Sequence, residues 1–268
     1  MGCEVLASVM DQKNSDFVVK RLGIDKRSRC LIVNQIVKRL LPKSDIVKGN
    51  HRFLSFNEKG LSRSRNRAID NSVGDICLIA DDDMKYVDDY EQKVLAAYKK
   101  YPDADIIAFI VDRENKVFSP KIKKEGRVSA LMTMKLSSVQ LTFRRKSIVD
   151  KNIRFDEEFG AGSKYPWGEE NIFLFDCIRK GCKVYYAPVK IATLLDLDKS
   201  SWDKSNTSKH YKQQGAIYYR MSPKLWWVLA LQFVIRKRKI YRMDMSGLDV
   251  FRAMVVGTKE YKLEHRDD

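Results

Sequence analysis

Residues 76–84 read Ile-Cys-Leu-Ile-Ala-Asp-Asp-Asp-Met, an unbroken apolar run followed by three consecutive carboxylates. An apolar run of this length is typical of a strand that is buried on both faces, as in a parallel sheet covered by helices. Ligands of open α/β sheets bind at the carboxyl ends of the strands, where Asp81, Asp82 and Asp83 stand. The stretch therefore predicts an α/β fold with a site at one edge of its sheet.

Short apolar runs alternate with helical patterns on both sides of this stretch. Strands are predicted at Glu4–Met10, Arg29–Asn34, Arg52–Phe56, Ile106–Val111, Ser137–Phe143 and Lys183–Ala187, the last one ended by Pro188. Helices are predicted at Asp16–Leu22, Leu61–Asn71, Tyr90–Tyr101 and Glu170–Lys180. This alternation predicts a mainly parallel, Rossmann-like sheet flanked by helices. Because the chain is predicted to be helical from about Ser208, we expect a catalytic domain at 1–200 and a C-terminal helical region at 201–268.

The composition is strongly basic, with 51 Lys and Arg against 35 Asp and Glu, a formal net charge of +16. Such a surface attracts anions, including nucleic acid, acidic lipid and phosphorylated substrates. The five cysteines form no CxxC pair, which favours reduced thiols and a cytoplasmic location. The N-terminus lacks the basic start and long apolar run of a signal peptide, so it is predicted to be a strand.

The three carboxylates after the apolar run have ligand chemistry suited to a hard cation. Side chains two residues apart share a face of an extended backbone, so Asp81 and Asp83 are predicted to converge on one cation while Asp82 points elsewhere. Oxygen ligands suit Mg²⁺ or Mn²⁺, and Mg²⁺ commonly completes its shell with substrate phosphates. The alternative interpretation is an acidic turn that caps the next helix.

The predicted helix upstream carries a basic face. Spacing of i, i+3 and i+4 places Arg63, Asn66 and Arg67 together, where guanidinium groups would hold a diphosphate. The alternative is an ordinary solvated basic helix.

Residues 159–171 read Phe-Gly-Ala-Gly-Ser-Lys-Tyr-Pro-Trp-Gly-Glu-Glu-Asn, a Gly-rich loop predicted to be flexible that ends in two acids before a helix. A helix N-terminus favours the ionised carboxylate, and a general base must be ionised at neutral pH. Trp167 offers a flat apolar face for a sugar. The alternative is that Glu169 and Glu170 are only acids of a first helical turn.

These segments together resemble the inverting glycosyltransferases of family 2 and their glycosyltransferase-A fold, over about Glu4 to Leu195. The resemblance is strongest to bacterial members that assemble capsular or other surface polysaccharides. It is carried by residues 54–66, Leu-Ser-Phe-Asn-Glu-Lys-Gly-Leu-Ser-Arg-Ser-Arg-Asn, and by 79–84, whose triple acid matches the family's DxD motif. It implies a nucleoside-diphosphate sugar donor, UDP-linked, a Mn²⁺ or Mg²⁺ ion, and a glycan or lipid-linked saccharide acceptor.

The resemblance also implies roles for the acidic residues. Asp83, assisted by Asp81, would meet the metal, and Asp82 would lie near the ribose. Glu170 occupies the position of the second acid in the family's Glu-Asp pair and would be the general base. Because this chain has Glu where Asp is usual, Glu169 is the alternative base.

The remaining roles follow by position. Ser8, Asp11 and Asn34, at the ends of the first two strands, would face the nucleotide base and ribose, although residues 8–12 lack the family's usual Pro-Val/Thr-Tyr-Asn. Trp167, Gly168 and Glu169 would face the acceptor.

Two other functions remain open. A sugar nucleotidyltransferase should carry a glycine-rich phosphate loop after its first strand, but Met10 to Asp16 contains no glycine. A basic nucleic-acid-binding protein would fit the charge, but the chain has no zinc-finger spacing or RNP-like aromatic motif. We therefore expect an enzyme with no nucleic-acid partner.

Pro223 begins an apolar, Trp-bearing helix that runs to Ile235 and is followed by Arg-Lys-Arg-Lys at 236–239. Its apolar stretch is shorter than the roughly 20 residues that a spanning helix needs. Residues 223–242 are predicted to make a peripheral contact with the inner face of the cell membrane. The alternative is packing on the catalytic domain or on a second subunit in a homo-oligomer.

Overall fold

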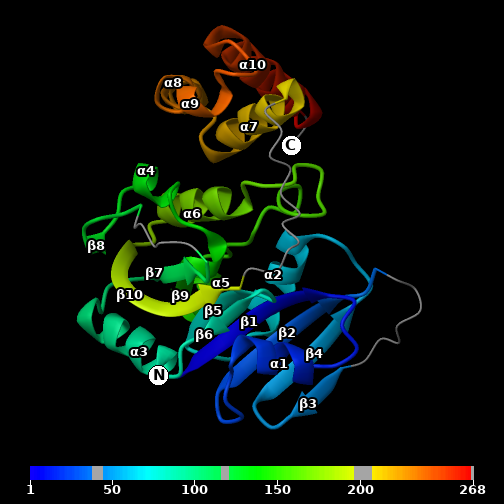
Figure 1. Cartoon of the computed structure of the whole chain (residues 1–268), viewed down its shortest axis with the longest axis vertical. Helices are drawn as coiled ribbons and strands as arrows, with labels where there is room; N and C mark the ends of the chain where they lie inside the picture. The colour runs from blue at the N-terminus through cyan, green and yellow to red at the C-terminus, as the bar shows by residue number, and fades with distance from the viewer. Residues whose placement is uncertain (38–44, 116–120, 196–206, 267–268) are drawn as a thin grey trace. The chain divides into compact units, whose positions relative to one another are not determined.

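The computed structural model describes residues 1–37, 45–115, 121–195 and 207–266, which belong to two compact units, Met1–Asp198 and Lys199–Asp268 (Figure 1). The expected domain boundary at residue 200 falls outside the described residues. All five cysteines are buried and free.

The first unit is built on a ten-stranded mixed sheet in the order β3-β4-β2-β1-β5-β9-β7-β10-β6, with β8 paired to β10. The strands are β1 (Cys3–Met10), β2 (Arg29–Gln35), β3 (Ile46–Lys48), β4 (His51–Phe56), β5 (Ile76–Asp81), β6 (Met84–Tyr86), β7 (Ile106–Arg113), β8 (Gly126–Arg127), β9 (Leu141–Arg144) and β10 (Val184–Leu194). Strands β4, β2, β1 and β5 are parallel neighbours. The predicted α/β class is confirmed, but β9 runs antiparallel between β5 and β7, so only part of the sheet is parallel.

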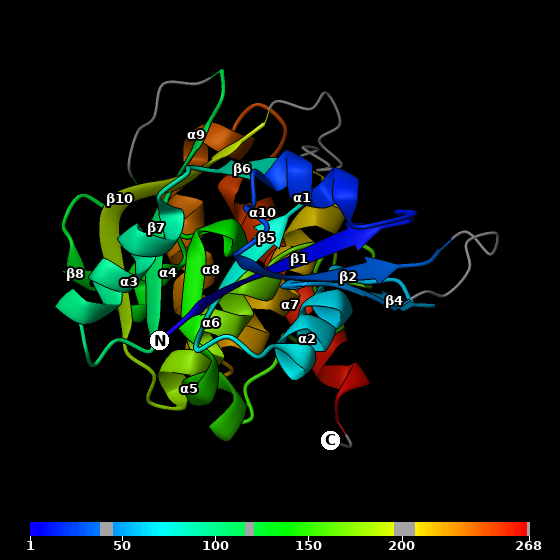
Figure 2. The same ribbon diagram turned by 90° about the horizontal axis from the view of Figure 1, so that it is seen from below.

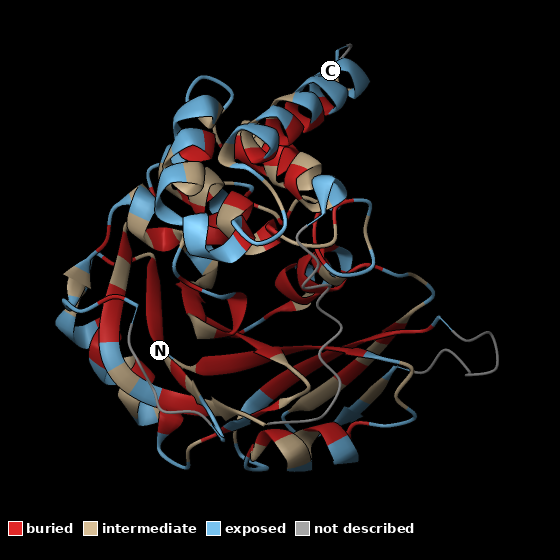
Figure 3. Ribbon diagram, turned by 45° about the horizontal axis from the view of Figure 1, so that its top comes forward, coloured by how far each residue is buried: buried red, intermediate tan, exposed pale blue. Residues whose placement is uncertain are grey.

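Helices cover both faces of this sheet (Figure 2). They are α1 (Asp16–Leu22), α2 (Leu61–Asn71), α3 (Tyr90–Lys100), α4 (Ala130–Thr133), the 3-10 turn η1 (Ser138–Gln140), α5 (Arg145–Asp150) and α6 (Glu169–Arg179). Successive side chains of β1 point to opposite faces of the sheet and so belong to two different hydrophobic cores. Val5 and Ala7 pack with α1 and α3, while Leu6 packs with α2, α5 and α6. Figure 3 shows the strands between these layers as mostly buried.

Two sequence predictions are wrong in detail. Pro188 does not end a strand, since β10 continues to Leu194 with register shifts after Tyr186. Proline has no N–H to donate, and an irregular stretch of pairing tolerates that loss. The strand predicted at Ser137–Phe143 begins only at Leu141, because the residues before it form η1.

The second unit contains the helices α7 (Ser208–Met221), α8 (Trp226–Arg236), α9 (Arg238–Tyr241) and α10 (Gly247–Glu264). The predicted helical character from Ser208 onward is confirmed. Among the described helices, none combines the length and apolarity needed to cross a membrane.

Helices α7 and α10 pack closely through glycines. A Cβ atom built on Gly215 would lie 2.0 Å from the Met254 carbonyl oxygen, and one built on Gly257 would lie 1.9 Å from that of Lys212. Both obstacles are backbone atoms, which cannot swing aside as a side chain can. The two glycines therefore set how close these helices approach.

We predict that Gly257→Ala lowers the free energy of unfolding by about 2 kcal/mol or more, because overpacking outweighs the higher helix propensity of alanine. Urea unfolding measures the loss. Lys259→Ala, on the exposed side of the same helix, is the control and should change stability by less than about 0.5 kcal/mol. Equal small effects of both substitutions would mean that the α7–α10 contact is looser than described.

Candidate active site

The buried side chain of Arg65 joins the segments that the sequence analysis singled out. Its Nη2 donates to Asp81 Oδ1 at the end of β5 (3.1 Å) and to Ser138 Oγ in η1 (2.8 Å). Its Nη1 donates to Glu169 Oε1 at the start of α6 (2.8 Å). Arg65 and Glu169 are each only 3% exposed. One guanidinium thus connects β5, α2, η1 and α6.

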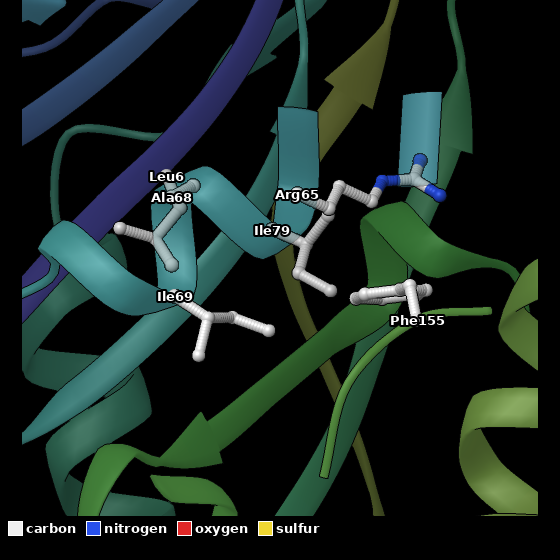
Figure 4. A pocket seen from close by; sticks show the side chains of 6 residues that line it. All are labelled: Leu6, Arg65, Ala68, Ile69, Ile79 and Phe155. Atoms are coloured by element: carbon white, nitrogen blue, oxygen red, sulfur yellow. The ribbon is translucent and has the colours of Figure 1, made fainter. Parts of the chain in front are cut away.

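The position of Arg65 follows from the inner face of α2. Ser62, Arg65 and Ile69 lie at i, i+3 and i+7, so they share the side of the helix that packs on the sheet. The Arg65 side chain lines a small apolar cavity of about 10 Å³ with Leu6, Ala68, Ile69, Ile79 and Phe155 (Figure 4). A space this small has room for one water at most, so the carboxylates are the main partners of the guanidinium.

Arg65 remains charged in this environment. Burial by itself would lower its pKa, but the carboxylates of Asp81, Glu169 and Glu170 outweigh that effect and raise it. The guanidinium carbon also lies 5.4 Å from the centre of the Phe155 ring. The site therefore contains a fixed cation that the sequence analysis did not assign.

The three acids lie at the end of β5 and on the turn that leads to β6. The prediction that Asp81 to Asp83 continue in extended conformation is wrong, because β5 ends at Asp81 and Asp82 and Asp83 form the turn. Arg21 of α1 donates to the Asp82 carbonyl (3.1 Å) and lies 3.7 Å from its carboxylate. The Asp83 carbonyl accepts from Leu195 N–H (2.7 Å), while Asp83 Oδ1 is buried and has no partner among the described residues.

These acids carry more negative charge than the surrounding cations neutralise. Burial, and then repulsion from Asp81, raises the pKa of Asp83; burial is also the main cause that raises the pKa of Asp82, opposed by Arg21. Within the described ranges, no group of three or more His, Cys, Asp or Glu side chains is arranged to hold a metal ion. Mg²⁺ is commonly held by one or two carboxylates and substrate phosphates, so the unpartnered Asp83 oxygen fits a cation that binds together with a diphosphate.

The two arginines of the face predicted to hold the diphosphate form ion pairs with acidic residues of the protein. Arg63 pairs with Glu157 (3.0 Å), and Arg67 pairs with Glu58 (3.3 Å). The Asn66 amide accepts from Phe155 N–H (2.8 Å) and donates to its carbonyl (2.9 Å). Arg63, Asn66 and Arg67 thus hold neighbouring loops in this structure.

The residues predicted to face the base and ribose differ in how they are bonded. The Asn34 amide binds both the N–H and the carbonyl of Gln12 (2.9 Å each), and Asp11 accepts from Val37 N–H (2.9 Å). Ser8 pairs with Asp81 in the register of β1 and β5, and its buried Oγ has no partner among the described residues. Ser8 is therefore the candidate with hydrogen-bonding capacity left for a ligand.

The Gly-rich loop before α6 is held against the start of α2. Ser62 Oγ donates to the Phe159 carbonyl (2.6 Å), and Leu61 N–H donates to that of Ala161 (2.9 Å). A Cβ atom on Gly160 (φ +104°) would lie 3.0 Å from Ser62 Oγ and 3.3 Å from Glu169 Cγ. The loop predicted to be flexible is thus fixed by hydrogen bonds, and only glycine allows Glu169 so close.

The two acids at the start of α6 have different environments. Glu169 and Glu170 each have a buried Oε2 without a partner in the described part of the chain, but Glu169 also accepts from Arg65 through its Oε1. Burial, and then the charge of Glu169, raises the pKa of Glu170 to about 8. Burial thus opposes the effect of the helix N-terminus, which is expected to keep this carboxylate ionised at neutral pH. The preceding Gly168 (φ +92°) caps α6, and Trp167 is half-buried beside it.

Residues 34–164 match the family Glycosyl transferase family 2. Over this segment, just under half of the chain, the sequence is similar to glycosyltransferase family 2. The matched segment includes the Asp81–Asp83 turn and Arg65, and it ends before Glu169 and Glu170. No curated protein sequence gives a significant match.

Two solved structures of S. aureus TarS share the fold of this chain. TarS residues 1–349 in complex with UDP-GlcNAc give a TM-score of 0.66 at 14% identity, covering 97% of this chain and 80% of that one. The same segment in complex with UDP gives 0.60 at 14% identity, covering 99% and 86%. The similarity shows the glycosyltransferase-A fold.

We predict that Arg65→Met lowers the free energy of unfolding by about 3–5 kcal/mol at neutral pH, because it leaves buried carboxylates without their cation. Urea unfolding provides the measurement. Arg63→Met, on the exposed side of the same helix, removes a half-exposed ion pair and should cost about 1 kcal/mol or less. A loss at Arg65 no larger than at Arg63 would show that the buried contacts do not stabilise the fold.

Proposed function

We propose that this glycosyltransferase moves a sugar from a UDP-linked donor to a hydroxyl of a glycan or lipid-linked saccharide, with inversion, in the synthesis of a surface polysaccharide. The observation that carries the proposal is the Arg65 network. It connects the acids at the end of β5, which lack enough cations, to the acids at the start of α6, where Glu169 and Glu170 each have an oxygen without a partner among the described residues. Donor-binding and proton-accepting groups would then share one buried charge cluster.

On the donor side, Asp81 and Asp83 are the residues that would hold a divalent cation, Mn²⁺ or Mg²⁺. A cation bound there would neutralise the diphosphate of the donor as negative charge develops on it. Asp82 would lie near the ribose, and Ser8 would donate to or accept from the nucleotide. The UDP-GlcNAc and UDP complexes of S. aureus TarS support a uridine nucleotide.

On the acceptor side, Glu170 would take the proton of the attacking hydroxyl. The hydroxyl oxygen forms a bond to the anomeric carbon while the bond from that carbon to the diphosphate oxygen breaks on the opposite face, so the configuration inverts. A base whose pKa lies near the working pH is efficient because it is partly ionised and still basic enough to accept a proton. Trp167 offers a surface on which an acceptor sugar would stack.

Glu170 suits this role better than Glu169. Glu169 is almost fully buried and its Oε1 accepts from Arg65, so a proton there would weaken the contact that connects α6 to α2. We infer that Glu169 positions Arg65 and raises the basicity of its neighbour. The net charge of +16 supports an anionic acceptor, such as a saccharide attached to a lipid phosphate.

We predict that Asp83→Ala lowers the rate of sugar transfer by about 100-fold or more, the scale of losing one electrostatic contact to a transition state. Asp81→Ala should also lower it severely. Release of UDP from a panel of UDP-sugars, followed across a Mn²⁺ titration, measures the effect.

The matched control is Asp88→Ala, an exposed acid a few residues further along. Because Asp83 is half-buried and its buried Oδ1 has no partner among the described residues, its loss should leave the free energy of unfolding unchanged or higher. If Asp83→Ala kept near wild-type turnover at limiting Mn²⁺, the assignment of the cation site would be wrong.

We predict that Glu170→Gln lowers kcat/KM by roughly 10²–10⁴-fold while the affinity for the UDP-sugar is kept, because the amide cannot accept a proton. In the unaltered enzyme, kcat/KM should rise about tenfold per pH unit and level off near the pKa of Glu170, about 8.

Glu169→Gln distinguishes the two acids. It removes a neighbouring negative charge and leaves Arg65 less neutralised, and both effects lower the pKa of Glu170. The rise in kcat/KM should therefore move to lower pH, which a pH profile from about 6 to 9.5 resolves. A larger loss of rate in Glu169→Gln than in Glu170→Gln, with no shift of the profile, would move the base to Glu169.

A further inference from the structure

Helix α8 of the second unit has apolar side chains on nearly all sides, but only one side of the helix is buried. Leu229 and Ala230 are buried within the unit. Trp227, Val228, Leu231 and Ile235 are exposed, with Trp227 at 50%, Leu231 at 45% and Ile235 at 67%. Spacing of i, i+1, i+4 and i+8 places these four residues on one side of the helix, away from the buried pair. We call this side the exposed face of α8.

A dense group of cations follows the exposed face directly. Arg236, Lys237, Arg238 and Lys239 are all exposed, and in the described parts of the chain none of them forms an ion pair. Between Ser208 and Met243 the sequence has nine Lys and Arg and no Asp or Glu. One or two cations would be enough to offset the dipole at the C-terminus of a helix. Four in a row, followed by Arg242, require another explanation.

The fold keeps these cations next to α8. Tyr241 at the end of α9 is buried, and its ring lies 6.4 Å from that of Phe233 on α8. Its hydroxyl donates to the carbonyl of Val234. These contacts hold the basic turn at the C-terminal end of α8. The exposed face and the cations are therefore parts of one fixed surface.

We propose that α8 and α9 form a docking surface for an anionic lipid bilayer, with the exposed face of α8 lying in the membrane interface. Apolar side chains, an amphipathic Trp and a neighbouring basic group are the combination that an anionic interface binds. With eleven residues, α8 is long enough to lie in the interface and too short to span the bilayer.

The charge favours a lipid surface over a second copy of this chain. A symmetric contact through the exposed face would bring the same surface of two subunits together, and the two basic groups would repel each other. Lipid headgroups supply the missing anions. This inference does not depend on the proposed function, because it rests on the second unit alone.

Vesicle sedimentation of the full chain tests the proposal. The protein should sediment with vesicles of equimolar phosphatidylcholine and phosphatidylglycerol at low salt. With phosphatidylcholine alone, or at about 1 M salt where charges are screened within a few Å, the apparent affinity should fall roughly tenfold or more.

Two variants address the two components of the surface. The first changes Arg236, Lys237, Arg238 and Lys239 to Gln, and the second combines Trp227→Ser with Leu231→Ser. Both should lose about tenfold or more in affinity for the anionic vesicles. The control changes four exposed lysines of the first unit, Lys26, Lys99, Lys123 and Lys124, to Gln and so removes the same charge. It should keep most of the binding.

Circular dichroism verifies folding, and because the four cationic side chains are exposed, the first variant keeps the test valid if the second is unstable. The proposal is overturned if the unaltered protein stays in the supernatant at low salt, or if the control variant loses as much affinity as the first. It is also overturned if the protein is an oligomer that ignores vesicles and that Trp227→Ser with Leu231→Ser dissociates.

Discussion

The site depends on the buried contacts of Arg65 with Asp81 and Glu169. A buried ion without its partner costs several kcal/mol, so the end of β5, the helix α2 and the start of α6 can each adopt their positions only together with the others. The same helix face also holds the loop before α6 through Ser62. Residues that are about a hundred positions apart in the chain are thereby fixed relative to one another before any ligand binds, which is the preorganisation that electrostatic catalysis requires.

Arg65 neutralises part of the negative charge of this region and leaves the rest. Asp82, Asp83 and Glu170 all have raised pKa values, for each of which burial is the main cause and neighbouring carboxylates add to it. Such an arrangement costs stability in the empty protein and favours ligands that bring positive charge or a proton. A diphosphate with its cation would bring positive charge, and an acceptor hydroxyl would bring a proton. The electrostatic imbalance is therefore an argument for two different ligands at two ends of one network.

Local patterns predicted the elements well, but they could not predict the contacts that the side chains make. The bounds of α1 and α2 agree with the prediction, because their apolar spacing and end signals are local. The same periodicity groups Arg63, Asn66 and Arg67 on one face, but it does not say which face packs inward; Ala68 and Ile69 decide that, and they turn Arg65 toward the acids. The antiparallel β9 and the continuation of β10 past Pro188 depend on pairings between distant segments, which no local pattern contains.

The net charge of the chain is distributed unevenly along the sequence, and this distribution bears on which anionic ligand the basic residues bind. Residues 199–268 contain 15 Lys and Arg against 7 Asp and Glu, so about a quarter of the chain carries +8 of the total +16. A groove for nucleic acid would need cations spread along a track with aromatic side chains between them for stacking on bases. Here the densest run of cations instead follows directly on an exposed apolar helix face. Apolar side chains gain little from contact with a phosphate backbone, whereas in a lipid interface they and the cations are satisfied at the same time.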